Sequence, residues 1–258
     1  MRPATNTPTP KGTVLLVHGY GEYSERYAPF MDVLTASGYD VISYDQRGHG
    51  NAPGPRARAD VGALIEDHLR ARREALRIAR TPDLFLFGHS MGGLVTAAST
   101  LIDHSRLRGT VLSGPALRPL PDVPAPAARA LLPLARLFPW LPVSGLDNSW
   151  ISRDPEVVRA ANEDPLMYHG RVPLLTGATM IVQGDEALRH ASLLATPTLI
   201  LQGSDDHIVS PDGARRFVAA THGADIELCI IPDAYHEVLN EPEGPALMRD
   251  IVEWLDAR

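Results

Sequence analysis

Short, uninterrupted apolar runs alternate with helix-like segments along this chain, and this alternation limits the possible folds more than any other feature. The runs occupy residues 13–17, 40–44, 84–87, 110–112, 198–201 and 226–231. A strand that is apolar at every residue is buried on both faces, which requires helices on either side of a parallel sheet. The pattern therefore predicts an α/β fold in which a mostly parallel sheet lies between two layers of helices.

Segments with helical periodicity connect these runs. The clearest spans residues 61–79, where Val61, Leu64, Ile65 and Leu69 fall on one face of a helix with about 3.6 residues per turn. Further helices are expected over residues 25–37, 90–102, 211–221 and 244–257. The alternation of strand and helix predicts one core domain built from residues 1–114 and 197–258.

Residues 115–196 interrupt this alternation. The segment is too long for an ordinary connection, and eight prolines fall between Pro115 and Pro142. It predicts a helical cap inserted after the fourth strand of the chain. Its apolar side chains have three open roles: packing against the core, lining a tunnel for an acyl chain, or contacting a membrane surface. These side chains are Leu131, Leu132, Leu134, Leu137, Phe138 and Trp140.

Charge and the lengths of the apolar runs argue against several classes of protein. The 258 residues carry a formal net charge of −7, whereas nucleic-acid-binding domains are normally basic, so we expect no nucleic-acid partner. No apolar run reaches the length of about 18 residues that a membrane-spanning helix needs. The first 12 residues lack the apolar stretch of a signal peptide. We therefore expect a cytoplasmic protein whose contact with membranes is at most peripheral.

The sequence Gly88-His89-Ser90-Met91-Gly92 fits the G-x-S-x-G pattern of a serine nucleophile. It follows the apolar run 84–87 and opens a helix, which is the context that the pattern requires. The turn from strand to helix is so sharp that side chains two residues before and after the serine would collide, so glycines stand there. The serine hydroxyl then lies at a helix N-terminus, where backbone N–H groups favour developing negative charge.

A serine hydroxyl becomes a strong nucleophile only when a base takes its proton and an acid orients that base. In folds with this nucleophile turn the acid and then the histidine follow the serine along the chain. Asp205 and Asp206 both follow the run 198–201, and His236 follows the last run. Three such residues, each directly after a strand and in the expected chain order, predict a catalytic triad.

The other histidines are weaker candidates for the base. His207 and His222 do not directly follow a strand end at the required place. His68, His104, His169 and His190 are expected on the surface or in the cap. No pair of histidines has the spacing of a zinc site, so we expect no metal and no other cofactor.

Ester hydrolysis also needs two backbone N–H donors that bind the oxyanion. Met91, directly after the serine, is expected to supply one donor. The loop that follows the first strand, His18-Gly19-Tyr20-Gly21, is expected to supply the other. The same loop allows a competing hypothesis of dinucleotide binding, because Gly19-x-Gly21-x-x-Ser24 follows a strand and Asp45 ends the next one. The third glycine of that pattern is absent, which weakens the hypothesis.

Together these motifs resemble the α/β-hydrolase superfamily and, within it, the monoacylglycerol lipases. The resemblance runs from about residue 12 to the C-terminus. Family members usually have two more strands before the first one here, and this chain has only about 12 residues in that place. The matching segments are HGYGEYSERY (18–27), SYDQRGHG (43–50), GHSMGG (88–93), ISRDPEV with NEDPL (151–166), LQGSDDHIVSP (201–211) and AYHEVLNEPE (234–243).

The resemblance assigns roles to individual residues. Ser90 matches the nucleophile, His236 the base, and Asp206 rather than Asp205 the acid. The backbone N–H groups that bind the oxyanion match Tyr20 and Met91. Two residues that help line the glycerol end of the pocket in the family match Glu22 and Arg26.

The resemblance implies a carboxylic ester hydrolase that cleaves monoacylglycerols to glycerol and free fatty acid through an acyl-enzyme. The implied partner is a small lipid ester, with transient membrane contact through the cap. Other substrates remain open on the same fold, namely those of a general carboxylesterase, a lysophospholipase or a thioesterase. A ligand-binding α/β-hydrolase without catalysis and a dinucleotide-binding oxidoreductase are the alternatives from other classes.

Overall fold

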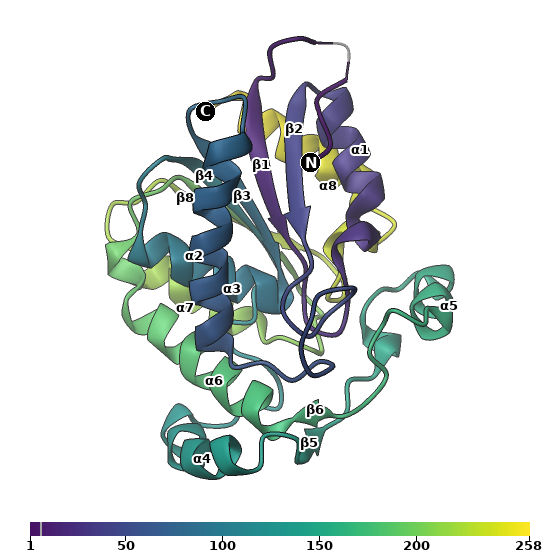
Figure 1. The fold of residues 1–258 in the computed structure, drawn as a ribbon, viewed down its shortest axis with the longest axis vertical. Coiled ribbons are helices and arrows are strands. Elements are labelled where there is room, and N and C mark those ends of the chain that lie inside the picture. Colours follow the sequence, from purple (N-terminus) through teal and green to yellow (C-terminus); the bar gives the residue numbers. More distant parts are fainter. Residues whose placement is uncertain (6) are drawn as a thin grey trace.

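The computed structural model describes residues 1–5 and 7–258 and has a central sheet between two layers of helices (Figure 1). Six strands pair in the order β2-β1-β3-β4-β7-β8, and every pair is parallel. This confirms the predicted α/β class with a parallel sheet. The strands are β1 Gly12–Val17, β2 Tyr39–Tyr44, β3 Leu84–His89, β4 Leu107–Ser113, β7 Thr198–Gly203 and β8 Ile226–Ile231.

The carboxyl ends of the strands are aligned. Val17 at the end of β1 is opposite Tyr44 in β2 and Gly88 in β3. Gly203 at the end of β7 is likewise opposite Ile231 in β8. The loops that follow these strands therefore begin at one edge of the sheet, where side chains from distant parts of the sequence meet.

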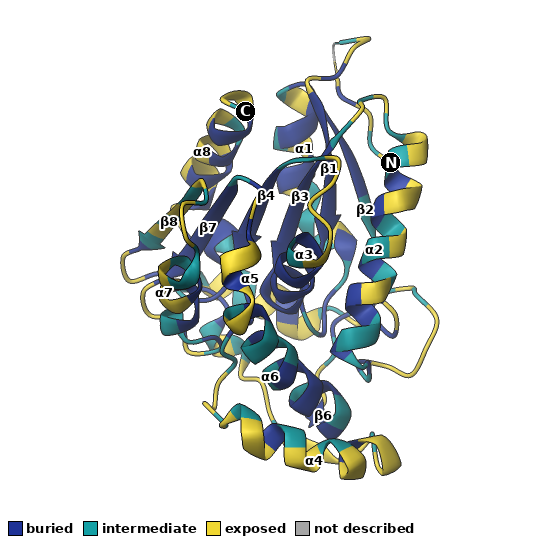
Figure 2. Ribbon diagram, turned by 90° about the vertical axis from the view of Figure 1, so that its left-hand side faces the viewer, coloured by how far each residue is buried: buried dark blue, intermediate teal, exposed yellow. Residues whose placement is uncertain are grey.

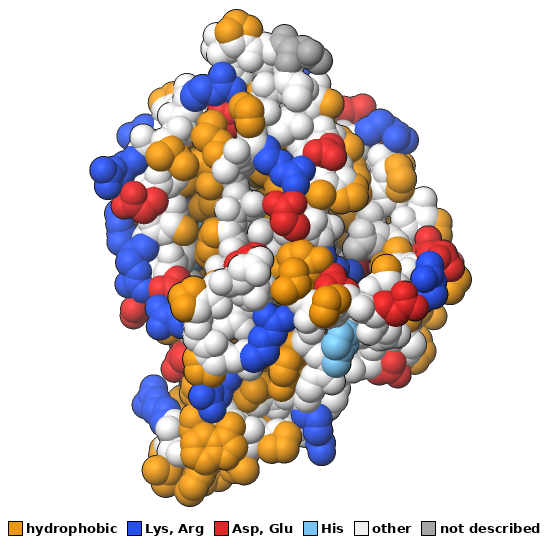
Figure 3. All heavy atoms as spheres, turned by 45° about the vertical axis from the view of Figure 1, so that its right-hand side comes forward, with side chains coloured by type: hydrophobic (Ala, Val, Ile, Leu, Met, Phe, Trp, Pro, Cys, Tyr) orange, Lys and Arg blue, Asp and Glu red, His pale blue; other side chains and the backbone are white. Residues whose placement is uncertain are grey.

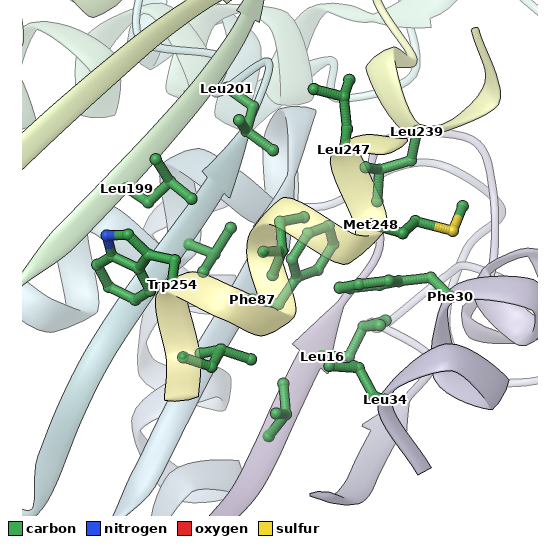
Figure 4. Packing of buried hydrophobic residues seen from close by; sticks show 14 of the residues in the cluster. Leu16, Phe30, Leu34, Phe87, Leu199, Leu201, Leu239, Leu247, Met248 and Trp254 are labelled. Carbon is green, nitrogen blue, oxygen red and sulfur yellow. The ribbon is translucent and has the colours of Figure 1, made fainter. Parts of the chain in front are cut away.

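Helices cover both faces of the sheet, as the apolar runs require. α1 and α8 cover one face, where Phe30, Leu34, Met248 and Trp254 pack on strand residues such as Phe87 (Figure 4). α2, α3 and α7 cover the other face. The helix expected over 25–37 begins as a short 3-10 turn at Ser24–Tyr27. The core helices are α1 Ala28–Ala36, α2 Val61–Ile78, α3 Ser90–Ile102, α7 Pro211–Ala220 and α8 Gly244–Asp256.

The two edges of the sheet are built differently. β1, β3 and β7 are buried along their whole length, but β8 is an edge strand in which Glu227 and Cys229 are exposed. At the opposite edge Arg2 forms an antiparallel bridge with Val41 of β2, with N–H to oxygen distances of 2.7 and 2.8 Å. This short N-terminal segment covers β2 where the resemblance implied two more strands, and it satisfies backbone groups that an open edge would expose.

Residues 115–196, which we call the cap segment, lie between β4 and β7 in the chain. In Figure 1 most of them lie beyond the carboxyl ends of the strands. β5 and β6 pair antiparallel, and α4 packs on α6. Figure 2 shows that α4 is largely exposed, in contrast to the sheet. The elements are α4 Ala125–Leu137, β5 Pro142–Ser144, η2 Asn148–Trp150, α5 Pro155–Glu163, β6 Val172–Pro173, α6 Leu174–Arg189 and η3 Ala191–Leu193.

In the described ranges, 1–5 and 7–258, no helix is both long enough and apolar enough to cross a membrane.

Candidate active site

Ser90 is in the sharp turn between β3 and α3, and its backbone has the left-handed φ of +54°. Two glycines make this turn possible. A Cβ atom at Gly92 would lie 2.2 Å from the carbonyl oxygen of His18, and one at Gly88 would lie 2.5 Å from the carbonyl oxygen of Gly92. Because these neighbours are backbone atoms, a larger residue cannot be accommodated without moving the backbone of the loop after β1 or of α3. The G-x-S-x-G pattern therefore has the steric cause that the sequence predicts.

Ser90, Asp206 and His236 come together from the loops after β3, β7 and β8. The hydroxyl of Ser90 is 2.8 Å from Nε2 of His236, and Nδ1 of His236 is 2.8 Å from Oδ2 of Asp206. All three residues are buried. Asp205 is not part of this arrangement, because its side chain is 56% exposed and faces His207 at 3.1 Å.

The Asp206 carboxylate has a full set of donors. Its Oδ2 also accepts a hydrogen bond from the Gln202 side chain at 2.8 Å, and its Oδ1 accepts from the N–H groups of Ile208 and Val209, both at 2.9 Å. Burial alone would raise the pKa of Asp206, but the charge of His236 and these hydrogen bonds outweigh it and lower that pKa. Burial opposes charging of His236 too, yet Asp206 raises the pKa of the imidazole.

The other histidines have different surroundings. The ring of His207 lies against Trp150, with centroids 3.8 Å apart and an angle of 35° between the ring planes. His68 was expected on the surface or in the cap, and this prediction is wrong. It is completely buried on the inner face of α2, and its Nδ1 is 3.0 Å from the hydroxyl of Tyr44. Burial lowers the pKa of His68 to about 3, so the ring is a neutral part of the core.

The loop after β1 is held beside Ser90 by hydrogen bonds from two directions. Gln46 donates its backbone N–H to Nε2 of His18 at 2.9 Å and its side-chain amide to the His18 carbonyl at 2.6 Å. Glu22 accepts the N–H of Gly19. These contacts fix the backbone at Tyr20. Met91 is the second residue of α3, where N–H groups have no partner within the helix.

Glu22, Arg26 and Glu237 form a cluster of ion pairs next to Ser90. Nη1 of Arg26 donates to Glu22 at 2.7 Å and to Glu237 at 2.8 Å, and Nη2 donates to Glu237 at 3.0 Å. Burial would raise the pKa of Glu22, but Arg26 outweighs it and lowers that pKa to about 2. Glu237 was not predicted as a site residue, although it directly follows His236 in the segment AYHEVLNEPE that carries the resemblance.

A cavity of about 230 Å³ extends from Ser90 between the core and the cap segment. Apolar side chains of the cap segment form most of its far walls, among them Leu131, Val143, Leu146 and Met180. Of the six apolar cap residues that the sequence singled out, only Leu131 lines this cavity in the described structure. Leu134, Leu137, Phe138 and Trp140 are exposed without lining it, Leu131 is itself partly open to solvent, and Leu132 packs on α6.

The cap segment contacts both loops that surround the serine. The carbonyl oxygen of Ile151 accepts the N–H of Glu237 at 2.7 Å, which holds the loop that carries His236. The N–H of Tyr168 donates to the carbonyl of Gly21 at 2.7 Å, which holds the loop after β1. These backbone contacts have no residue pattern of their own, so the sequence did not predict them.

The described residues can be compared with the metal and dinucleotide hypotheses. In the part of the chain that the structure describes, no group of three or more His, Cys, Asp or Glu side chains could hold a metal ion. Asp45, which the dinucleotide hypothesis needs for a ribose, instead accepts hydrogen bonds from the N–H and hydroxyl of Ser24 and from the N–H of Asn51. Its two oxygens therefore hold the loop at Ser24 and the loop at Asn51.

Comparisons with known proteins agree with this geometry. The family described as serine aminopeptidase, S33, matches residues 8–243. The chain is 34% identical to a monoacylglycerol lipase of Mycolicibacterium smegmatis over 247 residues, which cover 95% of this chain and 88% of that protein. It is 28% identical to the human monoglyceride lipase over 256 residues, which cover 98% of this chain and 84% of that one.

Two solved structures have the same fold over nearly the whole chain. The crystal structure of Paleococcus ferrophilus monoacylglycerol lipase superposes with a TM-score of 0.86 at 34% identity, covering 96% of this chain and 95% of that one. A soluble variant of monoglyceride lipase from Saccharomyces cerevisiae, in complex with a substrate analog, superposes with a TM-score of 0.88 at 26% identity. That match covers 99% of this chain and 89% of the other.

Proposed function

Because this chain belongs to the serine aminopeptidase S33 family of α/β-hydrolases and, within that fold, to the monoacylglycerol lipases, we propose that it hydrolyses monoacylglycerols. The products are glycerol and a free fatty acid. One observation carries the proposal. The hydroxyl of Ser90 is within 2.8 Å of His236 at one end of a largely apolar cavity, and His236 is within 2.8 Å of Asp206.

In the proposed mechanism His236 accepts the proton of Ser90 as the hydroxyl attacks the ester carbonyl. Asp206 orients the imidazole and stabilises its charged form. The N–H groups of Tyr20 and Met91 bind the oxyanion of the tetrahedral intermediate. His236 then protonates the leaving glycerol, and a water molecule repeats the cycle on the acyl-enzyme to release the fatty acid.

Release of fatty acid from a panel of esters tests this function. The panel compares monoacylglycerols of several chain lengths with di- and triacylglycerols, lysophospholipids, acyl thioesters and short activated esters. We expect turnover of monoacylglycerols that is lost in Ser90→Ala, because the nucleophile contributes up to about 10⁶-fold in enzymes of this kind. Serine-dependent turnover of short activated esters alone would contradict the lipid assignment and leave a general carboxylesterase.

We also propose that residues 115–196 act as a cap whose exposed apolar side chains contact a lipid surface. Leu134, Leu137, Phe138 and Trp140 are exposed, with 58% of Trp140 accessible. Figure 3 shows apolar side chains gathered at the cap end of the molecule. Clustered exposed apolar groups are typical of surfaces that bind a protein or a membrane. The contact is peripheral, and a cytoplasmic location stays a prediction from the sequence.

Binding to vesicles tests the cap proposal. The double variant Phe138→Ser/Trp140→Ser should sediment less with phosphatidylcholine vesicles and should lose more activity on vesicle-borne long-chain monoacylglycerol than on a dissolved short ester. Ile78→Ser is the matched control, because Ile78 is a similarly exposed apolar residue (54%) at the end of α2. Equal losses on both substrates would contradict the proposal.

A further inference from the structure

Negatively charged side chains outnumber positively charged ones on the lining of the cavity. Glu22, Arg26 and Glu237 lie near Ser90, and the other lining residues among those described include no Asp, Glu, Lys or Arg. Two carboxylates therefore face one guanidinium. Two histidines also line the cavity. Burial lowers the pKa of His89 to about 4, so it adds no positive charge near neutral pH, and His236 is neutral in the form that accepts the proton of Ser90. This end of the cavity has a net negative charge before any substrate enters.

The one guanidinium is already paired with both carboxylates. Arg26 binds Glu237 through both Nη atoms and Glu22 through Nη1, at distances of 2.7 to 3.0 Å. Proteins usually recognise phosphate and carboxylate groups with an arginine that is free to form two parallel hydrogen bonds. An anionic head group that approached Arg26 would also lie beside the carboxylates of Glu237 and Glu22, which repel it.

The hydroxyl groups of a substrate would have hydrogen-bond acceptors at this end of the cavity. Oε2 of Glu22 and Oε1 of Glu237 each accept one hydrogen bond, from Arg26, among the described residues. A carboxylate oxygen can accept about two. Each glutamate can therefore accept a hydrogen bond from the O–H group of an uncharged polyol. Its negative charge would also attract a cation.

We propose that Glu237, together with Glu22, makes this end of the cavity select esters of uncharged or cationic alcohols and exclude esters whose alcohol carries a phosphate or carboxylate. The inference rests on the proposed function and narrows its substrate class. Glu237 acts here as a specificity-determining residue through its charge. At an effective dielectric constant of about 20, a carboxylate charge roughly 10 Å from a charged alcohol group changes the ratio of kcat/KM between uncharged and charged substrates by about tenfold.

The first test compares two substrates with the same acyl chain, a monoacylglycerol and a lysophosphatidic acid. Glu237→Gln removes the charge and keeps the size of the side chain. We expect the wild type to prefer the monoacylglycerol in kcat/KM, and Glu237→Gln to reduce this preference about tenfold. If the substitution also slows catalysis because Glu237 is next to His236, both substrates are affected equally, and the ratio of their kcat/KM values does not change.

Glu243→Gln is the matched control, because Glu243 is on the same loop but is 46% exposed and pairs with Arg153 outside the cavity. It should leave the ratio unchanged. An unchanged ratio in Glu237→Gln, or an equal change in Glu243→Gln, would overturn the proposal.

A second test uses the wild type alone, so it can be interpreted even if Glu237→Gln fails to fold. Butyrylcholine and 3,3-dimethylbutyl butyrate have the same shape, and only the first carries a positive charge. We expect a kcat/KM about tenfold higher for butyrylcholine. Equal values would overturn the proposal. Because this test needs only serine-dependent hydrolysis of a short ester, its outcome is separate from any failure on long-chain monoacylglycerols.

Discussion

Replacing Asp206 by asparagine should abolish most of the activity and leave the fold intact. Oδ1 of Asp206 accepts two backbone N–H groups at 2.9 Å, while Oδ2 accepts from His236 and Gln202 at 2.8 Å. The single oxygen of asparagine is expected to stay with the two backbone donors. Its NH₂ group then faces His236 and forces Nδ1 of the imidazole to become an acceptor.

This change reverses the roles of the histidine. With Nδ1 as an acceptor, Nε2 carries the proton and donates toward Ser90, so it cannot take the serine proton. The same substitution in a serine protease lowers kcat by about 10⁴, which corresponds to about 5 kcal/mol of transition-state stabilisation. We expect a loss of the same order here.

The fold should tolerate the substitution because Gln202 can adapt. Its Oε1 has no hydrogen-bond partner among the described residues. Rotation of the amide therefore presents an acceptor to the new NH₂ group. We expect a loss in unfolding free energy of only about 1–2 kcal/mol.

Hydrolysis of p-nitrophenyl butyrate at saturation, with near-ultraviolet circular dichroism as a check of folding, measures the effect. Asp205→Asn is the matched control, because Asp205 is the neighbouring carboxylate but faces His207 and solvent. It should retain activity within about twofold of the wild type, since surface changes of this kind shift energies by about 0.5 kcal/mol or less. More than a tenth of the wild-type rate in a folded Asp206→Asn variant, or equal losses in both variants, would refute the reasoning.

Two further predictions follow from the geometry around the nucleophile. Since Asp206 raises the pKa of His236 above its usual value, kcat/KM should fall on acidification with a midpoint above pH 6.5, and a midpoint below this value would contradict the proposed pair. Gly92→Ala should lose folded protein and activity, because its Cβ would lie 2.2 Å from the His18 carbonyl oxygen and overpacking of this kind costs about 1–3 kcal/mol. Gly62→Ala is the control, because the nearest atom to a Cβ at Gly62 is a side-chain oxygen at 3.1 Å. Thermal unfolding and activity assays should show that Gly62→Ala keeps its stability and its activity.

Much of the fold was predictable because its signals are local. A run such as residues 84–87 is apolar at every position only if both faces are buried, and the structure places it in the centre of the sheet. Glycines at 88 and 92 mark the turn because a Cβ there would meet backbone atoms. The choice of Asp206 over Asp205 came from the resemblance, since both residues follow the same strand.

What the sequence left open depends on contacts between distant segments. Trp140 and Leu131 are both apolar cap residues, yet only Leu131 faces the cavity, because the orientation of α4 and the following loop is set by packing on α6. The burial of His68 follows from its place on the inner face of α2 against Tyr44. Glu237 gains its importance from Arg26, which is 211 residues away in the sequence.

Identification of the nucleophilic residue tests the central claim most directly. The enzyme would be incubated with a long-chain alkyl fluorophosphonate, and the adduct would be located by intact mass and peptide mapping. Our account predicts one adduct, on Ser90, that is absent in Ser90→Ala and forms far more slowly in Asp206→Asn. Hydrolysis of monoacylglycerol that persists in Ser90→Ala, or an adduct on another residue, would contradict it.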